Sequence, residues 1–351
     1  MIVLVPWLLA QAAPAPSASP AEVALIWNGL DLSWGYNHRI NRMGSLVLPT
    51  RCDAAGCASQ VLVTGATGSG SDAAAWRVPV VAVRAPGVRF VQGQTSCRVE
   101  DRRGEGQVLP DLRHVEVPGP AGQTALVALG GFDLRATRDP DRLQHLRLWV
   151  GDAVVSPDHA RVGFDVGVGL QLDCDSPECD PLDRAVSYDV TVAWTVITAE
   201  GDLDVTPLQV DRASAWRRHG PELSPEPLQA PLPHAEGAPG AAFLVMQDLS
   251  VTLNRDHHLQ QWTSTVETGV SEGAPVGRYG LLFKQWNAET RRRLLSYTSH
   301  GTAAWSMRLA YLQLPGGEAT PQELSGTLSW EANGRAPDPA RSQVLTTVAL
   351  P

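Results

Sequence analysis

The stretch DLSVTLNRDHHLQQWTSTV, from Asp248 to Val266, joins two strand-like runs through a short polar cluster. Its ends alternate small polar and apolar residues, and its middle gathers Asn, Arg, Asp and two His. Alternation with a period of two is typical of half-buried β-strands. Similar stretches occur from Asp31 to Val47 and from Phe132 to Val150. The sequence therefore predicts that one strand–turn–strand element occurs three times.

Outside these stretches the same alternation continues, and long helical periodicity is scarce. Strand-like runs include Gln60 to Thr64, Gly163 to Leu172, Tyr188 to Ile197 and Ala304 to Leu314, and Gly- and Pro-rich turns separate them. Many short strands joined by such turns favour β-sandwiches or barrels. We predict an all-β protein of two or three tandem antiparallel β-sandwich units, with Glu289 to Leu295 as the one place where a helix is an alternative to a loop.

Shifts in composition predict how the 351 residues divide. The clearest shift is the Pro-rich segment 221–240, expected to be an extended linker or surface loop. A weaker break lies around Asp101 to Gly122. We expect β units over 22–115, 122–220 and 241–351. The order of motifs around Asp133 and Trp194 returns at similar spacing around Asp248 and Trp305, which predicts that the second and third units are repeats.

The N-terminal segment 1–20 is expected to be a signal peptide followed by a linker. Ile2 to Leu9 is an apolar run of suitable length, and Ala10-Gln11-Ala12 fits a cleavage site, although no basic residue precedes the run. No later run is long enough for a membrane-spanning helix. The net charge of −9 argues against a nucleic-acid partner, which would need clustered Lys and Arg. We therefore predict a secreted or otherwise extracytoplasmic protein.

Five cysteines agree with export. Cys52 and Cys57 enclose turn-forming residues, as do Cys174 and Cys179, and each pair is expected to close a short disulfide loop. A zinc site built from the four thiols is the alternative, but the pairs lie far apart and no His stands at ligand spacing. Cys97 is left over, either buried and free or paired with another chain.

Two groups of residues have the chemistry of a sugar site. A sugar offers an apolar C–H face and a rim of hydroxyl groups, so binding needs an aromatic ring beside hydrogen-bonding side chains. Such groups occur in the third unit, where Trp262 is a further ring, and in the first unit. The predicted sugar-binding residues are Trp286, Tyr279, Asn254, Arg255, Asp256, His257, Trp34, Tyr36, His38 and Arg39. The alternative for Asn254 to His258 is a solvated hairpin loop. Trp194 and Trp305 are expected to lie in the sandwich core.

The order Gly131-Phe132-Asp133-Leu134, Leu146-Arg147-Leu148, Gly163-Phe164-Asp165-Val166 and Val192-Ala193-Trp194 resembles the H-type lectin domain. In the third unit the similar elements are Asp248-Leu249-Ser250, Arg278 to Phe283, Trp286 to Thr290 and Ala304-Trp305. The resemblance covers at most half of the chain. It implies a small secreted β-sandwich that binds galactose-type sugars and assembles as trimers. Ala288-Glu289 stands where the family usually has its acid, and Gln171 or Leu172 stands where it has Trp.

Catalytic motifs are not evident: the sequence has no H-E-x-x-H element, and Gly65 to Gly70 lacks the Lys-Thr/Ser of a phosphate loop. We predict no catalytic residue, metal or cofactor, and non-enzymatic recognition of glycans or cell-surface glycoconjugates. If three units pack like a trimer, one chain would be an intramolecular pseudo-trimer; a homo-oligomer is the other possibility. The alternative functions are an exported structural or adhesion protein that binds other proteins, and a secreted hydrolase.

Overall fold

The computed structural model describes residues 22–34, 40–67, 73–101, 109–119, 124–136, 142–173, 186–199, 201–215, 228–232, 240–253, 257–271, 274–287, 302–329 and 342–351. Within these ranges the chain forms strands and turns and no helix, which confirms the predicted all-β class. It follows that none of the described residues belongs to a helix long and apolar enough to cross a bilayer. The expected signal peptide and the helix-or-loop segment 289–295 lie outside the described residues.

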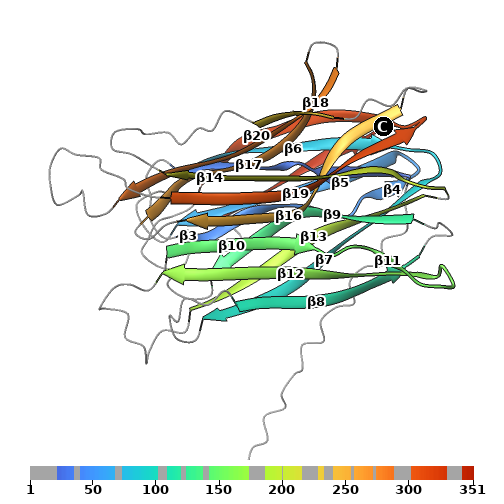
Figure 1. Cartoon of the computed structure of the whole chain (residues 1–351). Helices are drawn as coiled ribbons and strands as arrows, with labels where there is room; N and C mark the ends of the chain where they lie inside the picture. The colour runs from blue at the N-terminus through green and yellow to red at the C-terminus, as the bar shows by residue number, and fades with distance from the viewer. Residues whose placement is uncertain are drawn as a thin grey trace, which may run out of the picture.

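The described strands form three seven-stranded antiparallel sheets (Figure 1). Sheet A has the order β21 (Gln343–Leu350), β5 (Gly56–Thr67), β3 (Ile40–Val47), β9 (Thr124–Ala136), β13 (Val186–Ala199) and β7 (Val88–Asp101), with β4 (Arg51–Asp53) beside β5. Sheet B has the order β1 (Val23–Trp27), β6 (Ala73–Arg84), β2 (Gly29–Trp34), β17 (His257–Ser271), β18 (Ala274–Asn287) and β15 (Leu228–Pro231), with β20 (Glu318–Ser329) beside β6. Sheet C has the order β11 (Val154–Val155), β12 (Arg161–Asp173), β10 (Arg142–Val150), β16 (Gly240–Leu253), β19 (Thr302–Pro315) and β14 (Asp204–Ala215), with β8 (Leu109–Pro118) beside β12.

Three sequence repeats share these sheets in cyclic order. The first long strand of each repeat pairs with the second strand of the repeat before it: β9 with β3, β16 with β10, and β2 with β17. The segment after each repeat then supplies an edge strand to the next: β8 pairs with β12, β15 with β18, and β21 with β5. Each sheet therefore combines strands of two repeats with one edge strand from the segment that follows the remaining repeat. The predicted linker 221–240 also contains a strand, β15, because backbone pairing at a sheet edge needs no alternating pattern.

Two kinds of strand sequence explain where the core lies. In β10 the buried residues alternate with more exposed ones, since only one face of the strand is covered. In β6 the run from Val78 to Val83 is buried throughout. One side of that run faces the main core, and the other faces a second core that includes Ile26, Ile197 and Phe243, one from each repeat. The continuous apolar runs thus mark the region where all three repeats meet.

Aromatic residues from the three repeats pack together inside the main core. Trp27, Phe132 and Trp262 meet edge to face, with ring centroids 6.3 Å and 6.1 Å apart. Trp262 is fully buried, so its inclusion in the sugar site was wrong: it stands opposite the buried Leu32 and faces the same core. Trp194 and Trp305 are buried, which confirms their place in the core.

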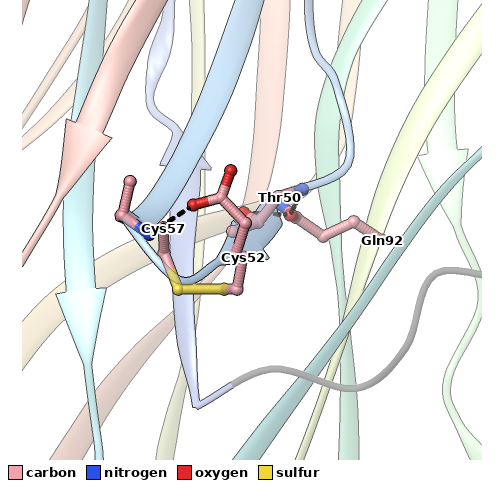
Figure 2. The surroundings of a disulfide bond; sticks show 6 residues. Thr50, Cys52, Cys57 and Gln92 are labelled. Carbon is pink, nitrogen blue, oxygen red and sulfur yellow. Dashed lines mark hydrogen bonds between the residues drawn. A yellow bond between two sulfur atoms is a disulfide. The ribbon is translucent and has the colours of Figure 1, made fainter.

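The disulfide Cys52–Cys57 confirms one of the two predicted cysteine pairs (Figure 2). It joins β4 to the start of β5 at an exposed hairpin, where the Asp53 carboxylate accepts a hydrogen bond from the Ala55 amide. Next to the hairpin, the Thr50 amide and hydroxyl both donate to Gln92, which anchors the tip to β7. Cys97 is free and buried. The predicted pair Cys174–Cys179 lies outside the described residues.

Candidate functional site

Three of the predicted sugar-binding residues lie at one end of sheet B. The backbone places Trp34 at the end of β2, His257 at the start of β17 and Trp286 near the end of β18. Since His258 is opposite Trp286, and Gln261 is opposite Ser33, these three strand ends lie side by side. Tyr279 is opposite Val266, well away from that end. The other predicted residues, Asn254, Arg255, Asp256, Tyr36, His38 and Arg39, lie outside the described residues.

A groove lies elsewhere, on the outer face of sheet C. It has a volume of about 680 Å³ and is lined by residues of β8, β12, β10, β16, β19 and β14, the strands seen side by side in Figure 1. Ligand pockets in proteins commonly have about 300–1,000 Å³. The groove therefore has the size of a small-molecule site.

Strand alternation positions the side chains of this groove. In β10, Leu146, Leu148 and Val150 are buried in the core, so His145, Arg147 and Trp149 point to the outer face. The same rule places polar side chains outward on the two neighbouring strands. These are Asp248 and Ser250 on β16, and Ser306 and Arg308 on β19.

The Trp149 ring lies over Gly167 of β12. A Cβ atom at residue 167 would stand 2.0 Å from Cζ2 and 2.1 Å from Cε2 of the ring, so any side chain there would displace it. Gly169, the next outward residue of β12, is opposite Arg147 and also lines the groove. The two glycines thus provide a low floor on which a large aromatic ring can rest at the surface.

Arg147 and Asp248 form an ion pair beside this ring. Arg147 Nε and Nη2 lie 3.1 Å and 2.6 Å from Asp248 Oδ2, and the guanidinium carbon lies 4.8 Å from the centroid of the Trp149 ring. The hydrogen bonds that Arg147 donates to the Asp248 carboxylate raise the pKa of the guanidinium above its ordinary value. The Arg147 side chain is 47% exposed, so its remaining donors face solvent. The Trp149 ring and the Arg147 guanidinium therefore form one accessible surface, and the Asp248 side chain that holds the guanidinium is only 14% exposed.

Arg308 of β19 binds the end of β10, where the pairing of β10 with β16 stops. Pairing between these strands ends at Trp149 and Asp248. Beyond that point Arg308 Nη2 donates to the Val150 carbonyl at 2.6 Å, and Nη1 donates to Asp152 at 2.9 Å. The Arg308 guanidinium thus takes the place of strand pairing at this point. It also gives the groove a second ion pair, with the exposed carboxylate of Asp152.

His145 lies at the other end of the β10 row. Its Nδ1 is 2.9 Å from the Thr252 hydroxyl. Burial, and then the positive charge of Arg147, lower the pKa of His145 below its ordinary value of 6.5. At neutral pH the groove therefore carries a neutral imidazole next to Arg147, with both a donor and an acceptor nitrogen.

The other two sheets repeat the aspartate, with a different residue opposite it. In sheet A the counterpart of Asp248 is Asp133, which accepts hydrogen bonds from Arg42 at 2.6 Å and from Thr64 at 2.7 Å. The Arg42 and Asp133 side chains are only 11% and 12% exposed, and Gly44 stands where sheet C has Trp149. The arginine of the motif is thus much more exposed in sheet C than in sheet A, whereas the two aspartates are about equally buried.

Sheet B has its own version of the motif. Its aspartate, Asp31, accepts a hydrogen bond from the Thr263 hydroxyl at 3.0 Å, and Arg77 Nε lies 3.6 Å from its carboxylate. Thr263 is directly opposite Asp31, as Trp149 is opposite Asp248. A short hydroxyl side chain therefore occupies the place of the ring in sheet B.

Sequence reasoning missed most of the groove. Arg147 and Asp248 were noted only as parts of separate motifs, and Trp149, Asp152 and Arg308 were not singled out. Two signals were present: alternation in RLQHLRLWV, which places His, Arg and Trp on one face, and alternate glycines in GVGL at 167–170. The pairing of the two strands across 101 residues was not readable from either.

Comparison with protein-family models, with curated proteins and with solved structures finds no match to this chain. The class of protein is therefore defined by its own fold and groove: an all-β protein of three interleaved repeats with an aromatic, charged groove on one sheet.

Proposed function

We propose that this chain is an exported carbohydrate-binding protein and that the groove on sheet C is its sugar site. The observation that carries the proposal is the Trp149 ring over Gly167 beside the exposed Arg147 guanidinium, which Asp248 holds in place by an ion pair. An aromatic ring suits the C–H face of a pyranose, and paired donors and acceptors suit its hydroxyl groups. This surface has both within one groove.

Recognition fits the groove better than catalysis. Its two carboxylates, Asp248 and Asp152, are each ion-paired with an arginine. Ionised carboxylates and guanidinium groups accept and donate hydrogen bonds strongly and in fixed directions. Such groups can bind hydroxyls at particular positions by hydrogen bonds, without exchanging protons with the ligand. We therefore keep the non-enzymatic function predicted from the sequence. The site, however, is placed on residues that the second and third repeats contribute together.

Export and a pseudo-trimeric chain belong to the same proposal. The disulfide Cys52–Cys57 supports export, since disulfides form in oxidising compartments. The cyclic sharing of sheets supports the pseudo-trimer, since each repeat meets the next in the same way. The resemblance to H-type lectins motivates galactose-type sugars as the first ligands to test.

A glycan array probed with the mature protein tests this function. We expect binding that falls at least about tenfold in Trp149→Ala and in Asp248→Asn, because each removes one part of the surface. Asp133→Asn is the matched control, since Asp133 has the same place in sheet A and a similar exposure. Its sugar binding, measured at a temperature where circular dichroism shows the variant folded, should equal that of the wild type. No binding to any glycan, or equal binding by the Trp149→Ala variant, contradicts the proposal.

A further inference from the structure

The groove runs across the strands of sheet C rather than along them. Its lining extends from Pro110 on β8 to Gln209 on β14, through β12, β10, β16 and β19. Neighbouring strands lie about 4.8 Å apart, so five intervals span roughly 24 Å along the face. That span is several pyranose rings long.

Strand register makes the groove continuous. One row of outward residues runs Gly169, Arg147, Ser250 and Ser306 on consecutive strands. Three of these four residues are small, so the row forms a low path with Arg147 rising from it. The parallel row has larger side chains, Trp149, Asp248 and Arg308, which form a wall beside the path. A ligand that lies in the path meets ring and charged groups along its length.

The charges of the groove are balanced. Arg147 is paired with Asp248, and Arg308 is paired with Asp152, so neither sign is in excess. An acidic ligand would have to compete with two aspartates for these arginines. Two exposed residues continue the wall row to its ends, beside the path. Leu112 on β8 is opposite Gly167 and 55% exposed, and Gln209 on β14 is opposite Arg308.

From this geometry we propose that the ligand is a linear, uncharged glycan chain lying across the strands of sheet C, and not a single terminal sugar. The inference rests on the proposed sugar site. A chain several residues long would contact Gln209 at one end and Leu112 at the other, with its central residues on Trp149 and Arg147. Affinity must then rise with chain length until both ends are reached.

Calorimetric titration of the full chain with cello-, xylo- and manno-oligosaccharides of one to six residues tests the inference. In the series that binds, we expect at least a tenfold gain in affinity between one and four residues. Gln209→Ala should weaken binding of the hexasaccharide about fivefold, the worth of one lost hydrogen bond, and leave the disaccharide unchanged. Leu112→Ser should do the same. Gln94→Ala and Leu345→Ser, exposed residues on β7 and β21 of sheet A, are the matched controls and should bind like the wild type.

The outcomes separate this inference from the proposed function. Full affinity for a monosaccharide, or the same loss for short and long chains in the end variants, overturns the inference and leaves the sugar site standing. Failure of all three series while the array shows a charged, branched or single terminal sugar bound also overturns the inference alone; a different linear, uncharged glycan on the array is titrated in the same length series and judged by the same criteria. Absence of binding in both experiments overturns the inference and the proposed function together.

Discussion

Replacement of Gly167 by alanine adds one methyl group beneath the Trp149 ring. The new Cβ would stand 2.0 Å from Cζ2, whereas ordinary contacts begin near 3.4 Å, so the ring has to move by at least about 1.4 Å. Gly167 is not among the glycines with a left-handed backbone, so alanine is not strained there by itself. The whole effect of the substitution therefore arises from the displaced ring.

The size of the effect follows from where the ring can go. Overpacking in a closed core costs about 1–3 kcal/mol. Because Trp149 is only partly buried, the ring can swing outward, and we expect a loss of about 1 kcal/mol in the free energy of unfolding. The affinity for sugar should fall by about tenfold or more, since a displaced ring no longer borders Arg147 and Asp248.

Two measurements on the same protein check this prediction: urea denaturation followed by circular dichroism, and titration with the glycan identified on the array. Gly163→Ala is the control. It lies in the same strand, but its Cβ would stand 3.3 Å from the ring of His114, an exposed side chain that can yield. The control should match the wild type in both assays. Wild-type affinity in Gly167→Ala would refute the role given to the Trp149 ring.

Three further predictions concern the scaffold. Asp133→Asn should destabilise the fold by about 1.5–3 kcal/mol in urea denaturation, because it weakens the charge-assisted hydrogen bonds that Arg42 donates to the Asp133 carboxylate, and a loss below about 0.5 kcal/mol would contradict this. The lowered pKa of His145 means that the unfolded chain binds the proton more readily. Stability should therefore be complete above pH 6.5 and decline as the pH falls below it, and this decline should shrink in His145→Gln. Replacing Cys52 and Cys57 by serine should cost only about 2 kcal/mol in thermal or urea unfolding, since the disulfide closes a short loop; complete unfolding would show that the hairpin matters more.

Local pattern was enough to predict the class of the fold. Alternating residues marked the strands, and the burial of Trp194 and Trp305 follows from the same alternation. Turn residues between Cys52 and Cys57 marked a disulfide hairpin, because that contact is local in sequence. The choice of strand partners was not local. Nothing in β3 itself indicates that it pairs with β9 of the next repeat rather than within its own.

The alignment of the repeats also shows the limit of sequence patterns. Trp194 and Trp305 were matched by spacing, yet they differ in register. Trp194 is opposite Leu129, before Asp133, while Trp305 is opposite Val251, after Asp248. Strands tolerate insertions at bulges, and β9 and β16 each contain one near the aspartate. The aspartates therefore identify equivalent positions, and the tryptophans do not.

The closure of sheet B between β2 and β17 has a consequence for the newborn chain. Asp31 meets its Thr263 partner only after 232 further residues have been made, and β5 of sheet A meets β21 later still. Folding during synthesis thus cannot complete the first repeat before β21 has been made. Proteins dominated by such distant pairings fold slowly and expose unpaired strands meanwhile. A chain with this topology would therefore depend on being kept apart from other partly folded copies until β21 has been made.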